Sequence, residues 1–232
     1  MLTVVRVVVA VLAGLAVFAP PAAARDVKLS DERSFTRTAD VREVVAVRRA
    51  PERGARRIGR LRRWTEGRFP ETYLLQRRRV VDGEPWVRIR LPGRPNGRAG
   101  WVPADALRAP RLVRWALVID RARLRIRLLR RGRVVWRAPV GIGAPGMATP
   151  RGHFWIREKF RGGGGIYGPW AFGTSAYSAL SEWPGGGVIG LHGTNQPGLV
   201  PGRPSHGCVR LRNRHIRHLA RRVPIGTPVR VR

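Results

Sequence analysis

The sequence is short of cysteine, lysine and acidic residues. Cys208 is the single cysteine among 232 residues, so an internal disulfide is excluded. Acidic residues number 14 against 46 lysines and arginines, and the formal net charge is +32 at pH 7. Lys28 and Lys159 are the only lysines, so arginine supplies nearly all of this charge. Such a charge predicts anionic surroundings. Because the arginines are spread along the whole chain, they indicate a generally basic surface and not a dedicated binding arm.

Long hydrophobic runs are also lacking, apart from one near the N-terminus. The apolar run Val7–Phe18 follows Arg6 and precedes the small residues Ala22–Ala24. This layout is typical of a secretory signal peptide over residues 1–24. The alternative is a retained membrane anchor, although a spanning helix needs about 20 apolar residues. We therefore expect an exported protein of the periplasm or cell wall, with membrane contact only through an uncleaved signal segment.

The expected export of the protein indicates which kind of anionic partner its positive charge would meet. Nucleic acid is one candidate for any strongly basic chain. A role in nucleic-acid binding conflicts with a signal peptide, so we expect no nucleic-acid partner. Anionic cell-wall polymers or phospholipid head groups fit an exported basic surface better.

Short strand patterns separated by turn residues predict a mainly β protein. Residues 25–40 are polar without a clear period, which predicts a flexible leader. After them, segments such as Pro85–Arg90 show the period of two of a half-buried strand. Many short strands with frequent turns predict a small β-barrel over residues 41–108. Residues 109–113 are expected to form a linker.

Residues 114–232 predict a second β-rich domain with one short helix. A turn at Arg131-Gly132 separates two strand patterns and predicts a hairpin. Near the C-terminus, apolar residues recur at helical spacing after Asn213, which we expect to cap the helix. A final strand is expected over residues 229–231.

His192 and Cys208 are the candidate reactive pair. They lie 16 positions apart, and the segment between them contains several glycines and prolines, which predicts a loop that returns the chain and brings both side chains together. A free thiol has a pKa near ~8.5, and a nearby histidine can take its proton to give a strong nucleophile. N–H groups around Gly207 and Cys208 could stabilise an oxyanion. Arg210 is placed to bind a substrate carboxylate.

Two structural alternatives remain for these residues. A lone cysteine can be a small buried apolar residue, and a lone histidine is more often structural than catalytic. His192, His206 and Cys208 could also bind zinc, but a structural zinc site needs four ligands and no fourth is evident at a matching spacing.

The whole constellation is more specific than its parts. His192-Gly193-Thr194, followed by Ser205-His206-Gly207-Cys208-Val209-Arg210 and Asn213, resembles the signature of L,D-transpeptidases, the YkuD-like catalytic domain. Thr149-Pro150-Arg151-Gly152-His153-Phe154 and Tyr167-Gly168 also match that family, and the resemblance covers residues 114–232. Upstream, Val47–Pro51, Trp86–Ile89 and Gly100–Pro103 resemble the bacterial SH3-like domain over residues 41–108.

The resemblance implies a catalytic β-sandwich of mixed sheets and a set of residue roles. Cys208 would attack the bond between the third and fourth residues of a peptidoglycan stem peptide, and His192, oriented by the Gly193 carbonyl, would accept the thiol proton. An amine on another stem would resolve the thioester and give a 3→3 cross-link, without metal or organic cofactor. The residues expected around the oxyanion or the bound substrate are Ser205, His206, Gly207, Arg210 and Tyr167.

Two other functions fit parts of the sequence. An L,D-carboxypeptidase would use the same site with water as the acceptor. A non-catalytic wall-binding protein would rely on the SH3-like part and the basic surface, but such a protein has no need for both Cys208 and His192.

Overall fold

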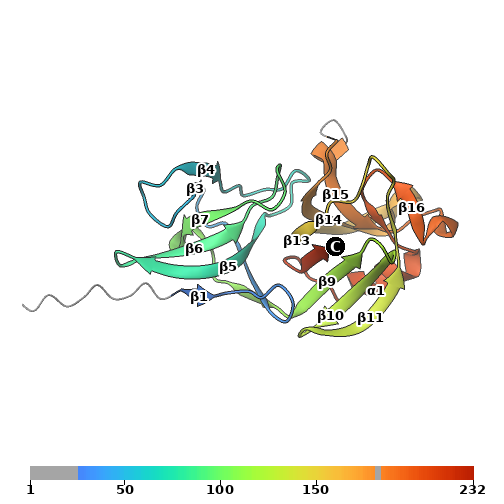
Figure 1. Ribbon diagram of the computed structural model, residues 1–232, viewed down its shortest axis with the longest axis horizontal. Helices are drawn as coiled ribbons and strands as arrows, with labels where there is room; N and C mark the ends of the chain where they lie inside the picture. The colour runs from blue at the N-terminus through green and yellow to red at the C-terminus, as the bar shows by residue number, and fades with distance from the viewer. Residues whose placement is uncertain (1–25, 181–183) are drawn as a thin grey trace, which may run out of the picture.

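The computed structural model describes residues 26–180 and 184–232, which form two β-rich halves lying side by side (Figure 1). The strands and the single α-helix of the described residues confirm the mainly β fold that the sequence predicts. The predicted signal segment, residues 1–24, lies outside the described residues. Within the described part of the chain, no helix is long and apolar enough to cross a membrane.

The N-terminal half is one antiparallel sheet. Its strands run in the order β4-β3-β7-β6-β5-β2-β8, and β1 pairs with β5. Val87, Ile89 and Val102 point to the same buried side, because alternate residues of a strand share a face. The bounds are β1 (Val27–Lys28), β2 (Thr36–Asp40), β3 (Ala46–Arg48), β4 (Arg57–Arg60), β5 (Thr72–Val81), β6 (Glu84–Arg90), β7 (Ala99–Pro103) and β8 (Arg111–Val113).

Two segments that the sequence predicts to be irregular are strands in the structure. Within the predicted leader 25–40, β2 lies between β5 and β8 and buries Thr36, Thr38 and Ala39. Threonine is polar but β-branched, so it fits a strand while hiding the apolar alternation that reveals one. The predicted linker 109–113 contains β8, which pairs with β2. Both predictions are therefore wrong for these residues.

The C-terminal half is a ten-stranded mixed arrangement with one helix. Its strands run in the order β11-β10-β9-β18-β13-β14-β15-β17-β12-β16. The bounds are β9 (Trp115–Asp120), β10 (Arg125–Arg130), β11 (Arg133–Pro139), β12 (Gly141–Gly143), β13 (Gly152–Gly164), β14 (Gly168–Tyr177), β15 (Val188–His192), β16 (Gly202–Ser205), β17 (Val209–Arg210), β18 (Pro228–Val231) and α1 (Asn213–Ala220).

The long strand β13 joins the two layers of this half. Its first residues pair with β18, and the stretch from Ile156 onward pairs with β14. Both layers contain parallel and antiparallel neighbours, since β18 runs parallel to β9 and β15 runs parallel to β17. Buried apolar residues from both layers form the larger core of the molecule. The structure thus matches the predicted sandwich of mixed sheets.

Local predictions in this half are confirmed except at the helix cap. Strands β10 and β11 form the expected hairpin through Arg131-Gly132. Helix α1 packs Ile216 and Leu219 into the core. Its N-cap is Arg212, which makes no side-chain capping bond. Asn213 does not cap the helix because its Oδ1 accepts a hydrogen bond of 2.9 Å from the Thr194 N–H.

A buried polar interface connects the halves. Arg157 of β13 is 1% exposed, and its Nε donates to Oε1 of Glu71 at 2.8 Å. Its Nη1 lies 3.0 Å from Oε2 of Glu66. Trp155 Nε1 donates to the carbonyl of Thr72 at 2.7 Å. Because Arg157, Glu71, Trp155 and Thr72 are buried and come from opposite halves, neither half completes its polar contacts alone.

Candidate active site

Adjacent parallel strands bring His192 and Cys208 together. Strand β15 ends at His192, and β17 begins directly after Cys208, with His192 paired to Arg210. The Gly190 N–H donates to the Cys208 sulfur at 3.3 Å. The glycine- and proline-containing segment between the two residues returns the chain, as the sequence predicts.

Both side chains line one cleft, which we call the thiol cleft. It has a volume of about 310 Å³ and is also lined by Tyr167, Glu158, Phe160 and Val188, with β14 and β15 as its floor. Half-exposed Tyr167 stands at the end of the β13–β14 hairpin, and its ring meets the edge of the His192 ring at a centroid distance of 5.1 Å. A substrate in this cleft would contact the sulfur, the imidazole and the tyrosine.

Backbone contacts fix the orientation of the His192 ring. Its Nδ1 lies 2.6 Å from the carbonyl oxygen of Gly193, the contact that the family resemblance implies. If Nδ1 carries the proton and donates to that carbonyl, Nε2 is the nitrogen left to accept a proton. A carbonyl thus takes the place that a carboxylate side chain has in other nucleophile–histidine sites.

Burial favours the neutral form of both reactive groups. Enclosure of the Cys208 thiol raises its pKa, and the Gly190 N–H and the Arg210 charge oppose this only in part. Burial lowers the pKa of His192, against the effect of the Gly193 carbonyl. A buried site disfavours the charged form of each group. The site is therefore built for proton transfer from thiol to imidazole during attack, rather than for a stored ion pair.

The turn before Cys208 is held by internal hydrogen bonds. Ser205 is buried, its hydroxyl donates to the Cys208 carbonyl at 2.6 Å, and it accepts from the Gly207 N–H at 3.2 Å. The Thr149 hydroxyl donates to the Gly207 carbonyl at 2.7 Å and accepts from the Gly143 N–H at 3.0 Å. Ser205 therefore supports the turn, and its hydroxyl engages the Gly207 N–H that the sequence predicts to lie near the oxyanion. The roles of Ser205 and Gly207 at the substrate stay predictions.

The remaining predicted residues lie around the cleft without lining it. His206 is exposed on the same turn. Arg210 is half-buried, donates to Gln196 Oε1 at 3.2 Å, and acts on both reactive groups through its charge. Within residues 26–180 and 184–232, no group of three or more His, Cys, Asp or Glu is arranged to hold a metal ion.

Among the residues that line the cleft, the charged one that sequence reasoning missed is Glu158. It lies between Arg157 and Lys159 on β13, so the local pattern resembles the alternating charges of an exposed strand. No spacing rule singles it out. Only the pairing of β13 with β14 places its carboxylate in the thiol cleft.

Comparison with known proteins identifies the family. The model of the YkuD family, the L,D-transpeptidase catalytic domain, matches residues 114–231. The chain belongs to this family. One relative is the putative L,D-transpeptidase YkuD of Bacillus licheniformis. It is 30% identical over 147 residues, which is 61% of this chain and 83% of that protein. The probable L,D-transpeptidase ErfK/SrfK of Salmonella typhimurium is 29% identical over 66% of this chain and 54% of its own length.

Two solved structures are similar to this chain over about half of each chain. A Bdellovibrio bacteriovorus protein is 26% identical with a TM-score of 0.42, covering 51% of this chain and 48% of that one. A cysteine-to-serine mutant of the Enterococcus faecium L,D-transpeptidase is 23% identical with a TM-score of 0.40, over 51% and 49% of the two chains. The family match begins at residue 114, so the SH3-like resemblance of residues 41–108 stays a prediction.

Proposed function

We propose that the chain is an exported L,D-transpeptidase that forms 3→3 cross-links in peptidoglycan through a thioester on Cys208. The carrying observation is the orientation of His192: its Nδ1 is anchored on the Gly193 carbonyl, and its ring lines the cleft that holds the Cys208 sulfur. Membership of the L,D-transpeptidase family supports the substrate class, a stem peptide.

The first half-reaction follows from the neutral pair. The Cys208 sulfur attacks the carbonyl carbon of the third stem residue, and its proton passes to His192. The C–N bond to the fourth residue then breaks, and the imidazolium returns the proton to the leaving amine. A thioester remains on Cys208. An amine of a second stem attacks this thioester, the C–S bond breaks, and the sulfur regains a proton.

Stabilisation of the oxyanion depends on the turn 205–208. Since Ser205 engages the Gly207 N–H, the backbone N–H of Cys208 is our candidate donor within this turn. Gly207 has φ of 123°, and a Cβ there would lie 2.7 Å from Ile189 Cδ1, so only glycine allows this turn. The Thr149 hydroxyl donates to the Gly207 carbonyl and so also holds the peptide between Gly207 and Cys208.

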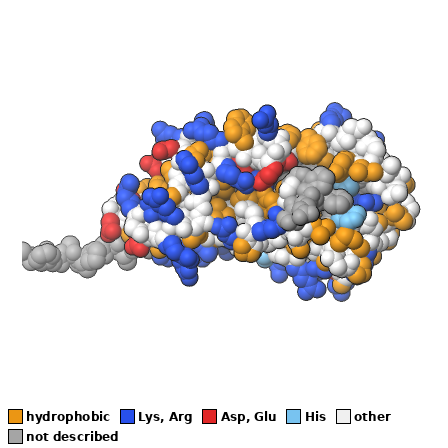
Figure 2. Space-filling view, turned by 90° about the horizontal axis from the view of Figure 1, so that it is seen from above, with side chains coloured by type: hydrophobic (Ala, Val, Ile, Leu, Met, Phe, Trp, Pro, Cys, Tyr) orange, Lys and Arg blue, Asp and Glu red, His pale blue; other side chains and the backbone are white. Residues whose placement is uncertain are grey.

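The charge and the N-terminal segment support location at the wall. Figure 2 shows lysine and arginine side chains over both halves, with few acidic side chains between them. A net charge of +32 favours contact with anionic wall polymers. The apolar run near Met1 supports export.

Intact-protein mass spectrometry tests the enzyme directly. A carbapenem offers a strained carbonyl that a cysteine nucleophile can open without loss of mass. We expect a stable adduct on the wild-type chain, none on Cys208→Ala and slow formation on His192→Ala. Tetrapeptide stems would then give a cross-linked dimer. A folded, reduced protein that forms neither adduct nor dimer would exclude the enzyme and favour wall binding. Hydrolysis without transfer would favour the carboxypeptidase.

A further inference from the structure

Glu158 is a buried carboxylate without a cationic partner. The described chain buries three carboxylates, and two of them, Glu71 and Asp120, are paired with arginines. Glu158 is 9% exposed and has no ion pair with any described residue. Because no described side chain neutralises it, this carboxylate can bind a cationic ligand. In a chain with 46 basic residues, a lack of available arginines is no explanation.

The N-terminal half holds this carboxylate in place. Oε1 of Glu158 accepts a hydrogen bond of 3.2 Å from the Gly67 N–H, which lies in the segment Trp64–Pro70. Beside it, Phe69 of the same segment stacks on Phe160 of the cleft wall at a centroid distance of 5.7 Å. The second oxygen, Oε2, has no donor among residues 26–180 and 184–232, and the residue lines the thiol cleft.

A row of glycines connects the carboxylate to the thiol. Glu158 pairs with Gly173 on β14, Gly173 pairs with Gly190 on β15, and the Gly190 N–H contacts the Cys208 sulfur. Paired Cα atoms in adjacent strands lie about 5 Å apart, so the Cα atoms of Glu158 and Gly190 are about 10 Å apart, and the carboxylate and the sulfur reach inward from these two ends. A Cβ at Gly173 would lie only 2.6 Å from Oε2 of Glu158. The floor between carboxylate and sulfur therefore carries no side chain.

We propose that Glu158, held by Gly67, is the subsite that binds the primary ammonium group of the acceptor. This inference rests on the proposed transpeptidase function and names the residue that favours an amine over water. An ammonium is a compact point charge with three donors, which suits a single free carboxylate oxygen at the end of a narrow floor. The strongly basic surface repels a cationic acceptor, so a local negative charge is needed to concentrate it in the cleft.

The proton balance of the second half-reaction agrees with this placement. The ammonium must lose one proton to water before its nitrogen can attack, while Glu158 holds the acceptor in the cleft. The nitrogen then forms the C–N bond with the thioester carbon, the C–S bond breaks, and the second proton passes through His192 to the Cys208 sulfur. The products are one amide, the free thiol and one proton released to water.

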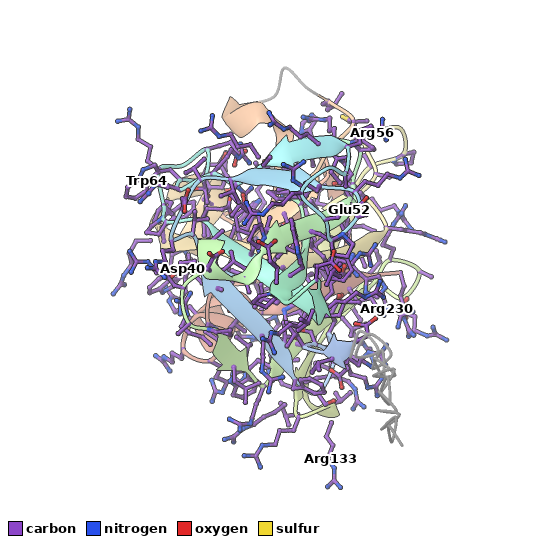
Figure 3. The ribbon with its side chains drawn as sticks, turned by 90° about the vertical axis from the view of Figure 1, so that its left-hand side faces the viewer. Asp40, Glu52, Arg56, Trp64, Arg133 and Arg230 are labelled. Atoms are coloured by element: carbon purple, nitrogen blue, oxygen red, sulfur yellow. The ribbon has the colours of Figure 1, made fainter. Side chains whose placement is uncertain are left out.

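The test measures how the acyl-enzyme divides between transfer to the acceptor and hydrolysis. This ratio does not depend on how fast the acyl-enzyme forms. Wild type, Glu158→Gln, Gly67→Ala and the charge-matched control Glu52→Gln are each acylated with a stem peptide in the presence of a diamino-acid acceptor. Glu52 is exposed in the N-terminal half and lies outside the cleft (Figure 3). The ratio of transfer to hydrolysis is read by mass spectrometry. Methanol serves as an uncharged acceptor.

We expect Glu158→Gln to lower the amine transfer ratio about tenfold or more, equivalent to ~1.4 kcal/mol. Gly67→Ala should lower it in the same direction, because its Cβ would lie 2.9 Å from Oε1 of Glu158. Transfer to methanol should be unaffected in both, and Glu52→Gln should match wild type throughout. An equal loss for methanol, or an unchanged amine ratio on an intact acyl-enzyme, would overturn the subsite alone. No acyl-enzyme on wild type would overturn the transpeptidase proposal and the subsite with it.

Discussion

The two halves of the molecule differ most in their acidic residues. Of the 14 acidic residues, only Asp120, Glu158 and Glu182 lie after residue 113. The N-terminal half therefore supplies the carboxylates that the C-terminal half lacks: Glu71 and Glu66 meet Arg157, and Glu32 meets His153. The C-terminal half supplies the thiol, the imidazole and the cleft. The C-terminal half thus holds every residue that lines the cleft, while the N-terminal half neutralises buried charges and supports two of the lining residues from outside, Glu158 and Phe160.

Replacement of His192 should have the largest effect. His192→Gln cannot accept a proton, so acylation near neutral pH should fall roughly 10²–10⁴-fold. Burial lowers the wild-type pKa of His192, so acylation should persist below the ordinary value of about 6.5 and fail only as the pH drops through that lowered pKa. Burial raises the pKa of Cys208, so the variant should recover only as the pH rises past about 8.5.

The measurement is the rate of carbapenem adduct formation across this pH range. His218→Gln is the matched control, because His218 stacks on Trp136 at a centroid distance of 4.6 Å outside the cleft. It should behave as wild type. Parallel pH profiles for His192→Gln and wild type would show that His192 is not the base.

Breaking the interface should have the next largest effect, on stability. Glu71→Gln leaves Arg157 buried without its closest carboxylate, although Glu66 remains at 3.0 Å. Removal of one partner from a buried pair costs about 3–5 kcal/mol, and we expect the lower end. Urea unfolding measures it. Glu84→Gln breaks the exposed pair with Arg53 and should cost at most about 1 kcal/mol. Equal costs would mean that the halves are joined mainly by apolar contacts.

The sequence predicted the C-terminal half better than the N-terminal half, for a physical reason. The motif around Cys208 and the apolar periodicity of β10 and α1 are local patterns, and the structure places them as expected. Strand β2 was missed because its buried Thr36 and Thr38 are polar. The partners of β2, namely β5 and β8, are far away in the sequence. Pairing over such distances cannot be read from periodicity.

Within the site, the sequence motif identified the reactive residues but not all of the hydrogen bonds around them. The Cys208–His192 pair and the Gly193 contact follow from the motif. The predicted roles of Ser205 and Gly207 stay predictions, and the motif did not reveal that the Ser205 hydroxyl accepts a hydrogen bond from the Gly207 N–H. Glu158 could not be predicted, since its position depends on pairing between strands and on Gly67 from the other half.

Two buried threonines, one in each half, allow the effect of losing a hydroxyl to be compared between the halves. Thr149→Val removes a hydroxyl that bonds both Gly143 and Gly207, so it should cost about 1–3 kcal/mol and slow acylation. Thr36→Val is the matched control in the N-terminal half. The buried Thr36 Oγ1 has no hydrogen-bond partner in the described chain, so the change should be neutral or stabilising. Unfolding and adduct rates measure both. If both variants lost a similar free energy of unfolding, the cost would come from placing the new valine methyl group and not from the lost hydrogen bonds.

Phe69→Leu should have the smallest effect, and it tests whether the N-terminal half influences acylation of Cys208. Phe69 belongs to the N-terminal half and reaches the thiol cleft only by stacking on Phe160. Leucine keeps an apolar side chain but removes the ring pair, which is worth about 0.5–1.5 kcal/mol. We expect a stability loss of that size in urea unfolding and less than a twofold change in carbapenem acylation. If Phe69→Leu instead slowed acylation as strongly as Thr149→Val, the N-terminal half would act on the thiol itself and not only on the wall of its cleft.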